Sequence, residues 1–145
     1  MRIKVAVAIA AFSIGFTGIA VGQDAPIPAR QELMKENGAA MKAASAMAKG
    51  EMAYDEAEAA GAMKIIADNM VEFPTLFPAD SQNSGDTKAA AAIWTDKEGF
   101  EAAAAKTVTD ANAAEAAAAQ GLEAFQTALG AVGANCGGCH KVYRN

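Results

Sequence analysis

The last helical segment of the chain carries the pattern that most constrains its fold. Between residues 122 and 143, the apolar residues follow one another at intervals that alternate between three and four positions. They are Leu122, Phe125, Leu129, Val132, Cys136, Cys139 and Tyr143. An α-helix places residues at this spacing on one face, so the segment predicts an amphipathic helix that packs against other helices.

Three earlier segments also predict helices, and they cover residues 28–49, 55–73 and 95–119. Asp55 and Thr95 each precede a glutamate by three positions, which is the spacing of a helix-capping box. Pro74 ends the second segment and opens the longest irregular stretch, residues 74–93. No segment shows a competing strand pattern. We therefore expect an all-α protein, an antiparallel up-down-up-down four-helix bundle.

Residues 1–22 have the organisation of a targeting signal. Arg2 and Lys4 form a short basic start, and residues 5–21 are almost wholly apolar. Ala20 and Gly22 are small residues at the positions that a signal peptidase reads. We expect residues 1–22 to be a cleaved signal peptide and residues 23–145 to form one exported domain. The alternative is an uncleaved membrane anchor, since the apolar run is nearly long enough to span a bilayer.

Both cysteines of the chain lie in the sequence Cys136-Gly137-Gly138-Cys139-His140. This Cys-x-x-Cys-His pattern is the attachment signature of c-type haem. Two thiols at this spacing reach two vinyl groups on one edge of a porphyrin, and the adjoining histidine reaches the iron from one face. On a helix, the three side chains share one face. The pattern therefore predicts one haem held covalently by Cys136 and Cys139, with His140 as an iron ligand.

Other uses of the two cysteines fit the chain less well. A thioredoxin-like redox pair opens a helix after a strand, whereas these cysteines close the last predicted helix. A structural zinc site needs about four ligands, and the chain has one histidine and two cysteines. A disulfide in an exported protein remains the alternative. With His140 committed to haem, the chain has no catalytic set of nucleophile, histidine and carboxylate, so we expect it not to be an enzyme.

The attachment pattern stands near the C-terminus, is followed by Tyr143-Arg144, and ends an alanine-rich chain of four predicted helices. Further upstream the chain contains Arg30-Gln31, the segment 73–78, Ile93-Trp94 and the segment 130–136. With these features the whole mature sequence resembles the class II c-type cytochromes, the cytochrome c' (cytochrome c-prime) family. The resemblance implies a four-helix bundle with the haem inside it, near the C-terminal end of the last helix. It also implies that homodimers are frequent.

The resemblance implies roles for residues outside the attachment pattern. Arg30 and Gln31 match positions that approach the haem edge and its propionates, where a cation offsets carboxylate charge. Phe77 matches an aromatic residue that packs near the ring, and Thr87 falls in the loop that passes the propionates. Simpler alternatives are a surface arginine at position 30 and an ordinary core position for Phe77.

Met34 is the expected sixth ligand of the iron. His140 is the only histidine, so a second imidazole is not available. With a rise of about 1.5 Å per residue, Met34 lies at a depth in the bundle similar to that of His140, and Met70 is the geometric alternative. The stretch from Leu33 to Gly38 resembles the low-spin, methionine-ligated branch of the family, which favours Met34. In the high-spin branch the sixth position is empty, and a methionine there only packs.

Together these features predict a periplasmic monohaem cytochrome that carries single electrons, with low-spin iron between His140 and Met34. The alternative function is a high-spin, five-coordinate cytochrome that binds nitric oxide or another small gas. Removal of residues 1–22 leaves 10 of the 12 basic residues against all 17 acidic ones, a net charge of −7. Such a surface repels nucleic acid and anionic membranes. The expected partners are redox proteins with basic docking patches, or a second copy of the chain.

Export can be tested through the mass of the mature protein. When the full chain is expressed together with a haem-attachment system, we expect the periplasmic product to begin at Gln23, because cleavage follows Gly22. Intact mass is the measurement, since an N-terminal glutamine can cyclise and block sequencing. A product that retains Met1 and sediments with membranes would show that the segment is an uncleaved anchor.

Overall fold

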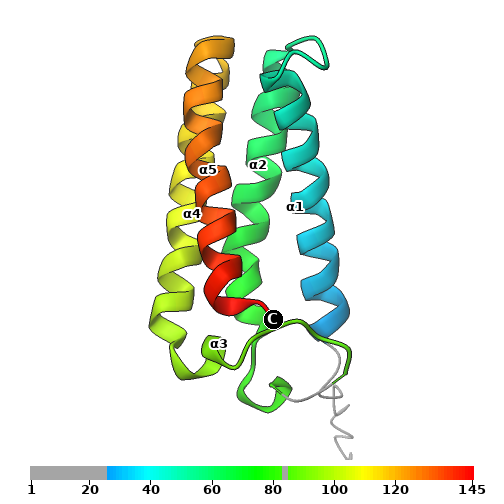
Figure 1. Ribbon diagram of the computed structural model, residues 1–145, viewed down its shortest axis with the longest axis vertical. Coiled ribbons are helices and arrows are strands. Elements are labelled where there is room, and N and C mark those ends of the chain that lie inside the picture. The colour runs from blue at the N-terminus through cyan, green and yellow to red at the C-terminus, as the bar shows by residue number, and fades with distance from the viewer. Residues whose placement is uncertain (1–25, 83–84) are drawn as a thin grey trace, which may run out of the picture.

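The computed structural model describes residues 26–82 and 85–145, and the predicted signal peptide lies outside them. Four long antiparallel helices make up most of the described chain (Figure 1): α1 (Pro26–Ala48), α2 (Glu56–Glu72), α4 (Lys97–Ala118) and α5 (Leu122–Tyr143). Three short elements join α2 to α4: the 3-10 turns η1 (Phe73–Leu76) and η2 (Ala79–Ser81), and the helix α3 (Ala92–Thr95). Among the described residues, no helix has both the length and the apolar character needed to cross a membrane.

The predicted up-down-up-down four-helix bundle is confirmed, and local signals set several helix ends. Asp55 caps α2, because its Oδ1 accepts a hydrogen bond of 2.8 Å from the backbone N–H of Glu58. The predicted cap of α4 at Thr95 is wrong. Asp96 takes that place and accepts a bond of 3.3 Å from the N–H of Gly99, while Thr95 ends α3.

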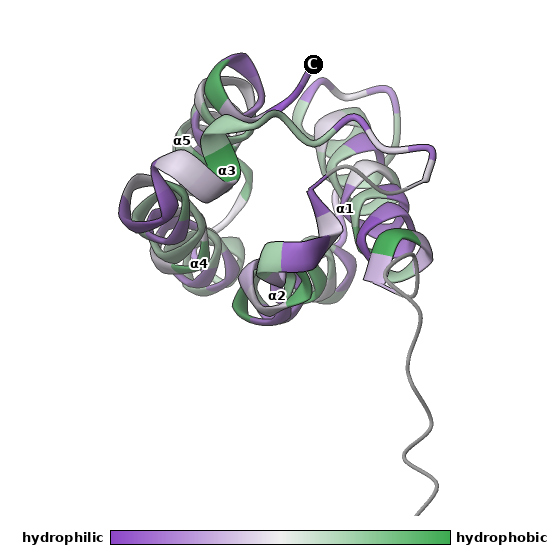
Figure 2. Cartoon of the chain, turned by 90° about the horizontal axis from the view of Figure 1, so that it is seen from below, coloured by the Kyte–Doolittle hydropathy of each residue, from purple (hydrophilic) through white to green (hydrophobic). Residues whose placement is uncertain are grey.

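Alanine determines how closely the long helices approach one another. α2 packs closely on α1 and on α4, and α4 packs closely on α5, whereas α1 and α5 meet less extensively. Figure 2 shows the helices in the order α1, α2, α4, α5 around the bundle, with α1 and α5 standing apart. Methyl side chains let helix axes come close. The fully buried alanines are Ala44 of α1, Ala59 of α2, and Ala111, Ala114 and Ala118 of α4.

Aromatic rings gather at the end of the bundle where α2 leads toward α3. The centre of the Phe77 ring lies 5.0 Å from those of Phe73 and Phe100 and 5.8 Å from that of Trp94. The ring of Phe100 lies 5.3 Å from that of Tyr143. All four of these pairs meet edge to face, an arrangement that aromatic rings prefer. The cluster joins the segment after α2 to both α4 and α5.

The end of α5 is tied to the segment before α3, and we call residues 143–145 the C-terminal strap. The N–H of Ala90 donates to the carbonyl of Tyr143 at 3.0 Å, and the N–H of Asn145 donates to the carbonyl of Lys88 at 2.8 Å. The hydroxyl of Tyr143 donates to Oδ2 of Asp96 at 2.7 Å. This bond raises the pKa of Tyr143 to about 12. Backbone and side-chain hydrogen bonds therefore both hold the last turn of α5 in place.

Phe125 allows a test of the packing far from the strap. Its side chain is 0% exposed, and its ring centre lies 5.9 Å from that of Tyr54. We expect Phe125→Ala to lower the free energy of unfolding by about 3–5 kcal/mol, because it removes buried apolar surface and leaves a cavity. Val71 is 64% exposed, so Val71→Ala should change this free energy by less than about 0.5 kcal/mol. Guanidinium unfolding curves measure the free energy of unfolding of both variants. Equal losses of this free energy in the two variants would contradict the prediction.

The bond between Tyr143 and Asp96 makes stability depend on pH at the alkaline end. The pKa of Tyr143 is about 12 in the folded protein and about 10 in an unfolded chain, so folding favours the protonated phenol. The contribution of the bond is present below about pH 10 and is lost as the pH rises toward 12. The stability difference between native protein and Tyr143→Phe should therefore shrink over this range.

Urea unfolding midpoints at a series of pH values measure this difference. The same comparison in an Asp96→Asn background is the control, because the carboxylate that raises the pKa is then gone. We expect little pH dependence in that background. A difference between native protein and Tyr143→Phe that stays constant up to pH 12 would contradict the role assigned to the bond.

Candidate haem-binding cavity

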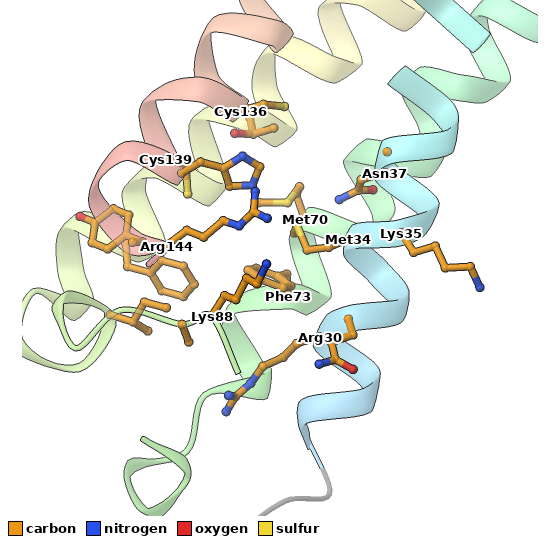
Figure 3. Close-up of a pocket in the computed structure, with 18 of the residues that line it drawn as sticks. Arg30, Met34, Lys35, Asn37, Met70, Phe73, Lys88, Cys136, Cys139 and Arg144 are labelled. Carbon is orange, nitrogen blue, oxygen red and sulfur yellow. The ribbon is translucent and has the colours of Figure 1, made fainter. Parts of the chain in front are cut away.

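A large cavity opens between α1, α2 and α5, at the end of the bundle that carries the C-terminal strap. Its volume is about 740 Å³, and its walls are mainly apolar. Every site residue predicted from the sequence lines it: Arg30, Gln31, Met34, Phe77, Thr87, Cys136, Cys139 and His140. The fold therefore brings residues from both ends of the described chain around one space (Figure 3).

The Cys-x-x-Cys-His pattern occupies the α5 wall of the cavity. Cys136 and Cys139 are half-buried, and their thiols are free rather than joined in a disulfide. Burial raises the pKa of both thiols. The pKa of His140 is lowered, first by burial and second by the positive charge of Arg144. At neutral pH this wall thus offers two protonated thiols beside a neutral imidazole.

The wall that faces α5 comes from α1 and α2. Met34 of α1 and Met70 of α2 converge on the same part of the cavity (Figure 3). Ile66 and Phe73 of α2 add further apolar surface. Methionine adapts its shape to irregular apolar spaces, so two thioethers here pack well against a flat group. The structure gives Met34 and Met70 comparable positions and does not single out one of them.

Arg30 is buried at the loop end of the cavity, with 4% of its surface exposed. Its Nε donates to the carbonyl of Leu76 at 2.7 Å, and its Nη2 donates to the hydroxyl of Ser81. The guanidinium carbon lies 4.0 Å from the centre of the Phe77 ring, and burial lowers the pKa of Arg30. Its Nη1 is buried without a hydrogen-bond partner among the described residues. The alternative of a surface arginine is therefore wrong.

Gln31 and Thr87 hold the segment at the rim of the cavity. Nε2 of Gln31 donates to the carbonyl of Asp86 at 2.9 Å. The hydroxyl oxygen of Thr87 accepts a bond of 3.1 Å from the N–H of Ala89. Phe77 lines the cavity and also belongs to the aromatic cluster. A position beside the haem ring and a position in the core, the two alternatives for Phe77, are therefore compatible.

Lys88 and Asn37 are among the polar cavity residues that the sequence analysis did not predict. Lys88 lies at the rim, in an irregular segment where no periodic pattern marks its position. Asn37 lies on α1, three positions after Met34 and four before Met41. Residues at this spacing share one helix face, so the spacing places Asn37 on the cavity side once Met34 is placed there. This spacing is the signal in the sequence that points to Asn37.

The chemistry of the cavity fits a c-type haem. A flat macrocycle needs apolar surface on both faces, and the cavity supplies it from α5 on one side and from α1 and α2 on the other. The free thiols of Cys136 and Cys139 stand one helical turn apart, next to the imidazole of His140. The partnerless Nη1 of Arg30 suits a carboxylate that the protein itself does not supply.

The sequence matches the family described as Cytochrome C' over residues 25–144. A cytochrome c' from Rhodopseudomonas palustris is 37% identical over 150 residues, which cover 99% of this chain and 97% of that protein. A cytochrome c-556 from Agrobacterium fabrum is 36% identical over 79% of this chain and 77% of that protein. The solved structure of cytochrome c' from Rhodopseudomonas palustris matches with a TM-score of 0.78 and 37% identity, over 83% of this chain and 95% of that chain.

These comparisons correct the predicted function. The sequence predicts a low-spin electron carrier with His140 and Met34 as axial ligands, whereas the family and the relative that spans nearly the whole chain are cytochromes c'. A nitric oxide complex of a cytochrome c' variant from Alcaligenes xylosoxidans shares the fold, with a TM-score of 0.77 at 23% identity over 86% of this chain and 98% of that chain. The error has a physical reason. Helical spacing brings a methionine to the cavity but does not distinguish a thioether that binds iron from one that packs.

The match in sequence and the match in structure point to the same group of proteins. Cytochrome c' is itself a standard example of the up-down-up-down bundle, so the architecture agrees with the sequence comparison. The agreement extends along the whole described chain, from the start of α1 to the C-terminal strap. The chain therefore belongs to the cytochrome c' family, whose proteins bind a covalently attached haem c with its iron.

Proposed function

We propose that this protein is a periplasmic, high-spin cytochrome c' that binds nitric oxide or another small gas at its haem iron. The observation that carries the proposal is the wall opposite His140, which is built mainly of apolar side chains. Haem iron with one protein ligand keeps a coordination position at which a small molecule binds. In this proposal Met34 and Met70 pack over that position and exclude water from it.

The residues of α5 hold the haem in this proposal. Cys136 and Cys139 supply the sulfur atoms of two thioether bonds to its vinyl groups, and the imidazole of His140 is the one protein ligand of the iron. The neutral state of that imidazole at pH 7 leaves its nitrogen free to bind metal. Arg144 lies close enough to His140 to lower its pKa, and so helps to keep it neutral.

The loop end of the cavity receives the polar edge of the haem in this proposal. Nη1 of Arg30 is the buried donor without a protein partner, and we assign it to a propionate carboxylate. Gln31 and Thr87 keep the rim segment in place beside that edge. Phe77 packs near the ring, between the guanidinium of Arg30 and the aromatic cluster.

Surface features support the proposed partners. The excess of acidic residues suits an electron donor with a basic docking patch, which would keep the iron reduced for gas binding. The proposed homodimer rests on the similarity to the cytochrome c' family, in which homodimers are frequent. Export to the periplasm rests on the signal sequence in residues 1–22.

Spin state tests the proposed function. We expect the ferric protein to give a high-spin optical and electron paramagnetic resonance spectrum, and the ferrous protein to bind carbon monoxide readily. Met34→Ala should remain high-spin, because Met34 packs and does not bind the iron. Intact mass one haem above the polypeptide verifies loading, and Cys139→Ser should leave at most one thioether bond.

Met52→Ala is the matched control, since Met52 lies in the turn before α2 and is 39% exposed. It should leave the spectrum unchanged. A native ferric spectrum that is low-spin, and that becomes high-spin in Met34→Ala alone, would contradict the proposed function and make Met34 an iron ligand.

A further inference from the structure

A buried amide side chain lies on the mainly apolar wall that faces α5. Asn37 follows Met34 by about one turn of α1, lines the cavity and is 9% exposed. Figure 3 shows its amide extending from α1 toward the side of the cavity that carries Cys136 and Cys139. A buried amide needs hydrogen-bond partners for its oxygen and for its nitrogen. The partners of Asn37 therefore indicate what the cavity accepts.

The amide oxygen of Asn37 already has a partner. Nδ2 of Asn69, on α2, donates to Oδ1 of Asn37 at 3.1 Å and to Oε2 of Glu36 at 3.0 Å. Because Oδ1 is directed at Asn69, Nδ2 of Asn37 is directed away from it. In the part of the chain that the structure describes, this nitrogen donates to no protein group. Its N–H groups are therefore available to an acceptor inside the cavity.

The other buried polar side chains that line the cavity have different surroundings. The hydroxyl of Thr107 donates to the carbonyl of Ala103 in its own helix at 2.9 Å, so its hydrogen is not available to a ligand. The guanidinium of Arg30 is held at the loop end by Leu76 and Ser81. Among the described residues, Asn37 is thus the buried polar side chain that lies on the wall opposite α5 and is not held by the loop.

We propose that Nδ2 of Asn37 donates a hydrogen bond to a small molecule bound at the iron on the side opposite His140. The inference rests on the proposed gas-binding function and deepens it. Diatomic ligands such as nitric oxide and carbon monoxide present an oxygen atom that accepts such a bond. Asn37 therefore favours ligands with an acceptor at their outer atom over apolar molecules of the same size.

Carbon monoxide is the probe for this inference, used with the ferrous, haem-loaded protein. Asn37→Leu replaces the amide with an apolar side chain of similar volume. Without the hydrogen bond, less electron density moves onto the ligand, so the C–O stretching band in the infrared spectrum should shift to higher wavenumber. Carbon monoxide should also dissociate about 2- to 10-fold faster, the change expected for loss of one hydrogen bond.

Thr107→Val is the matched control. It also replaces a buried polar group on the same cavity, but one whose hydrogen is already engaged within its helix. We expect no shift of the C–O band in this variant. Asn69→Ala keeps Asn37 and removes the bond that orients its amide, so the band should broaden or split. If Asn37→Leu does not fold, an unchanged band in Asn69→Ala overturns the inference.

The outcomes separate the two proposals. A native protein that binds carbon monoxide, together with an Asn37→Leu variant whose band and dissociation rate are unchanged, overturns the role of Asn37 and leaves gas binding intact. A native ferrous protein that does not bind carbon monoxide at its iron overturns the proposed function, and the role of Asn37 with it.

Discussion

The close packing of α4 against both α2 and α5 is the constraint on which the rest of the structure depends. It rests on small buried residues such as Ala111, Ala114 and Ala118, which leave little space between neighbouring helices. α2, α4 and α5 therefore form a compact unit, and α1 supplies the fourth side while standing off from α5. The cavity lies along that separation, lined by larger apolar side chains. The distribution of alanine among the helices thus determines where the bundle has room for a flat cofactor.

Arg30 joins this scaffold to the irregular segment that closes the cavity. Burying a charged group is costly unless its hydrogen bonds are satisfied, and the carbonyl of Leu76 and the hydroxyl of Ser81 satisfy two of the guanidinium nitrogens. The contact with Phe77 adds attraction between the cation and the ring. Because Phe77 also packs on Phe100, the position of the loop is linked to α1 and α4 together. These contacts therefore fix the loop end of the site to α1 and α4.

Periodic patterns predicted the helices, because one helix face is encoded by spacing along the chain. The Cys-x-x-Cys-His motif predicted the attachment residues. The contacts of Arg30 join residues 46 and 51 positions apart, and no local pattern encodes them. The cap of α4 was misplaced because Thr95 and Asp96 are both good capping residues, and the presence of α3 decides between them. Helical spacing placed Met34 at the cavity correctly. Spacing does not show, however, whether its sulfur binds iron. Fold and cofactor were thus within reach of the sequence, whereas the occupancy of the sixth coordination position was not.

The C-terminal strap has a consequence for how the molecule opens. Chain ends usually fray first, since few contacts hold them. Here the bonds from Ala90 to Tyr143 and from Asn145 to Lys88 turn the hairpin of α4 and α5 into a closed loop, tied at the strap and at the turn before α5. Opening this end requires several bonds to break at the same time, so its amide protons should exchange with solvent slowly for a chain terminus. The helix that carries the haem attachment residues is therefore held at its last turn by hydrogen bonds to residues outside the helix.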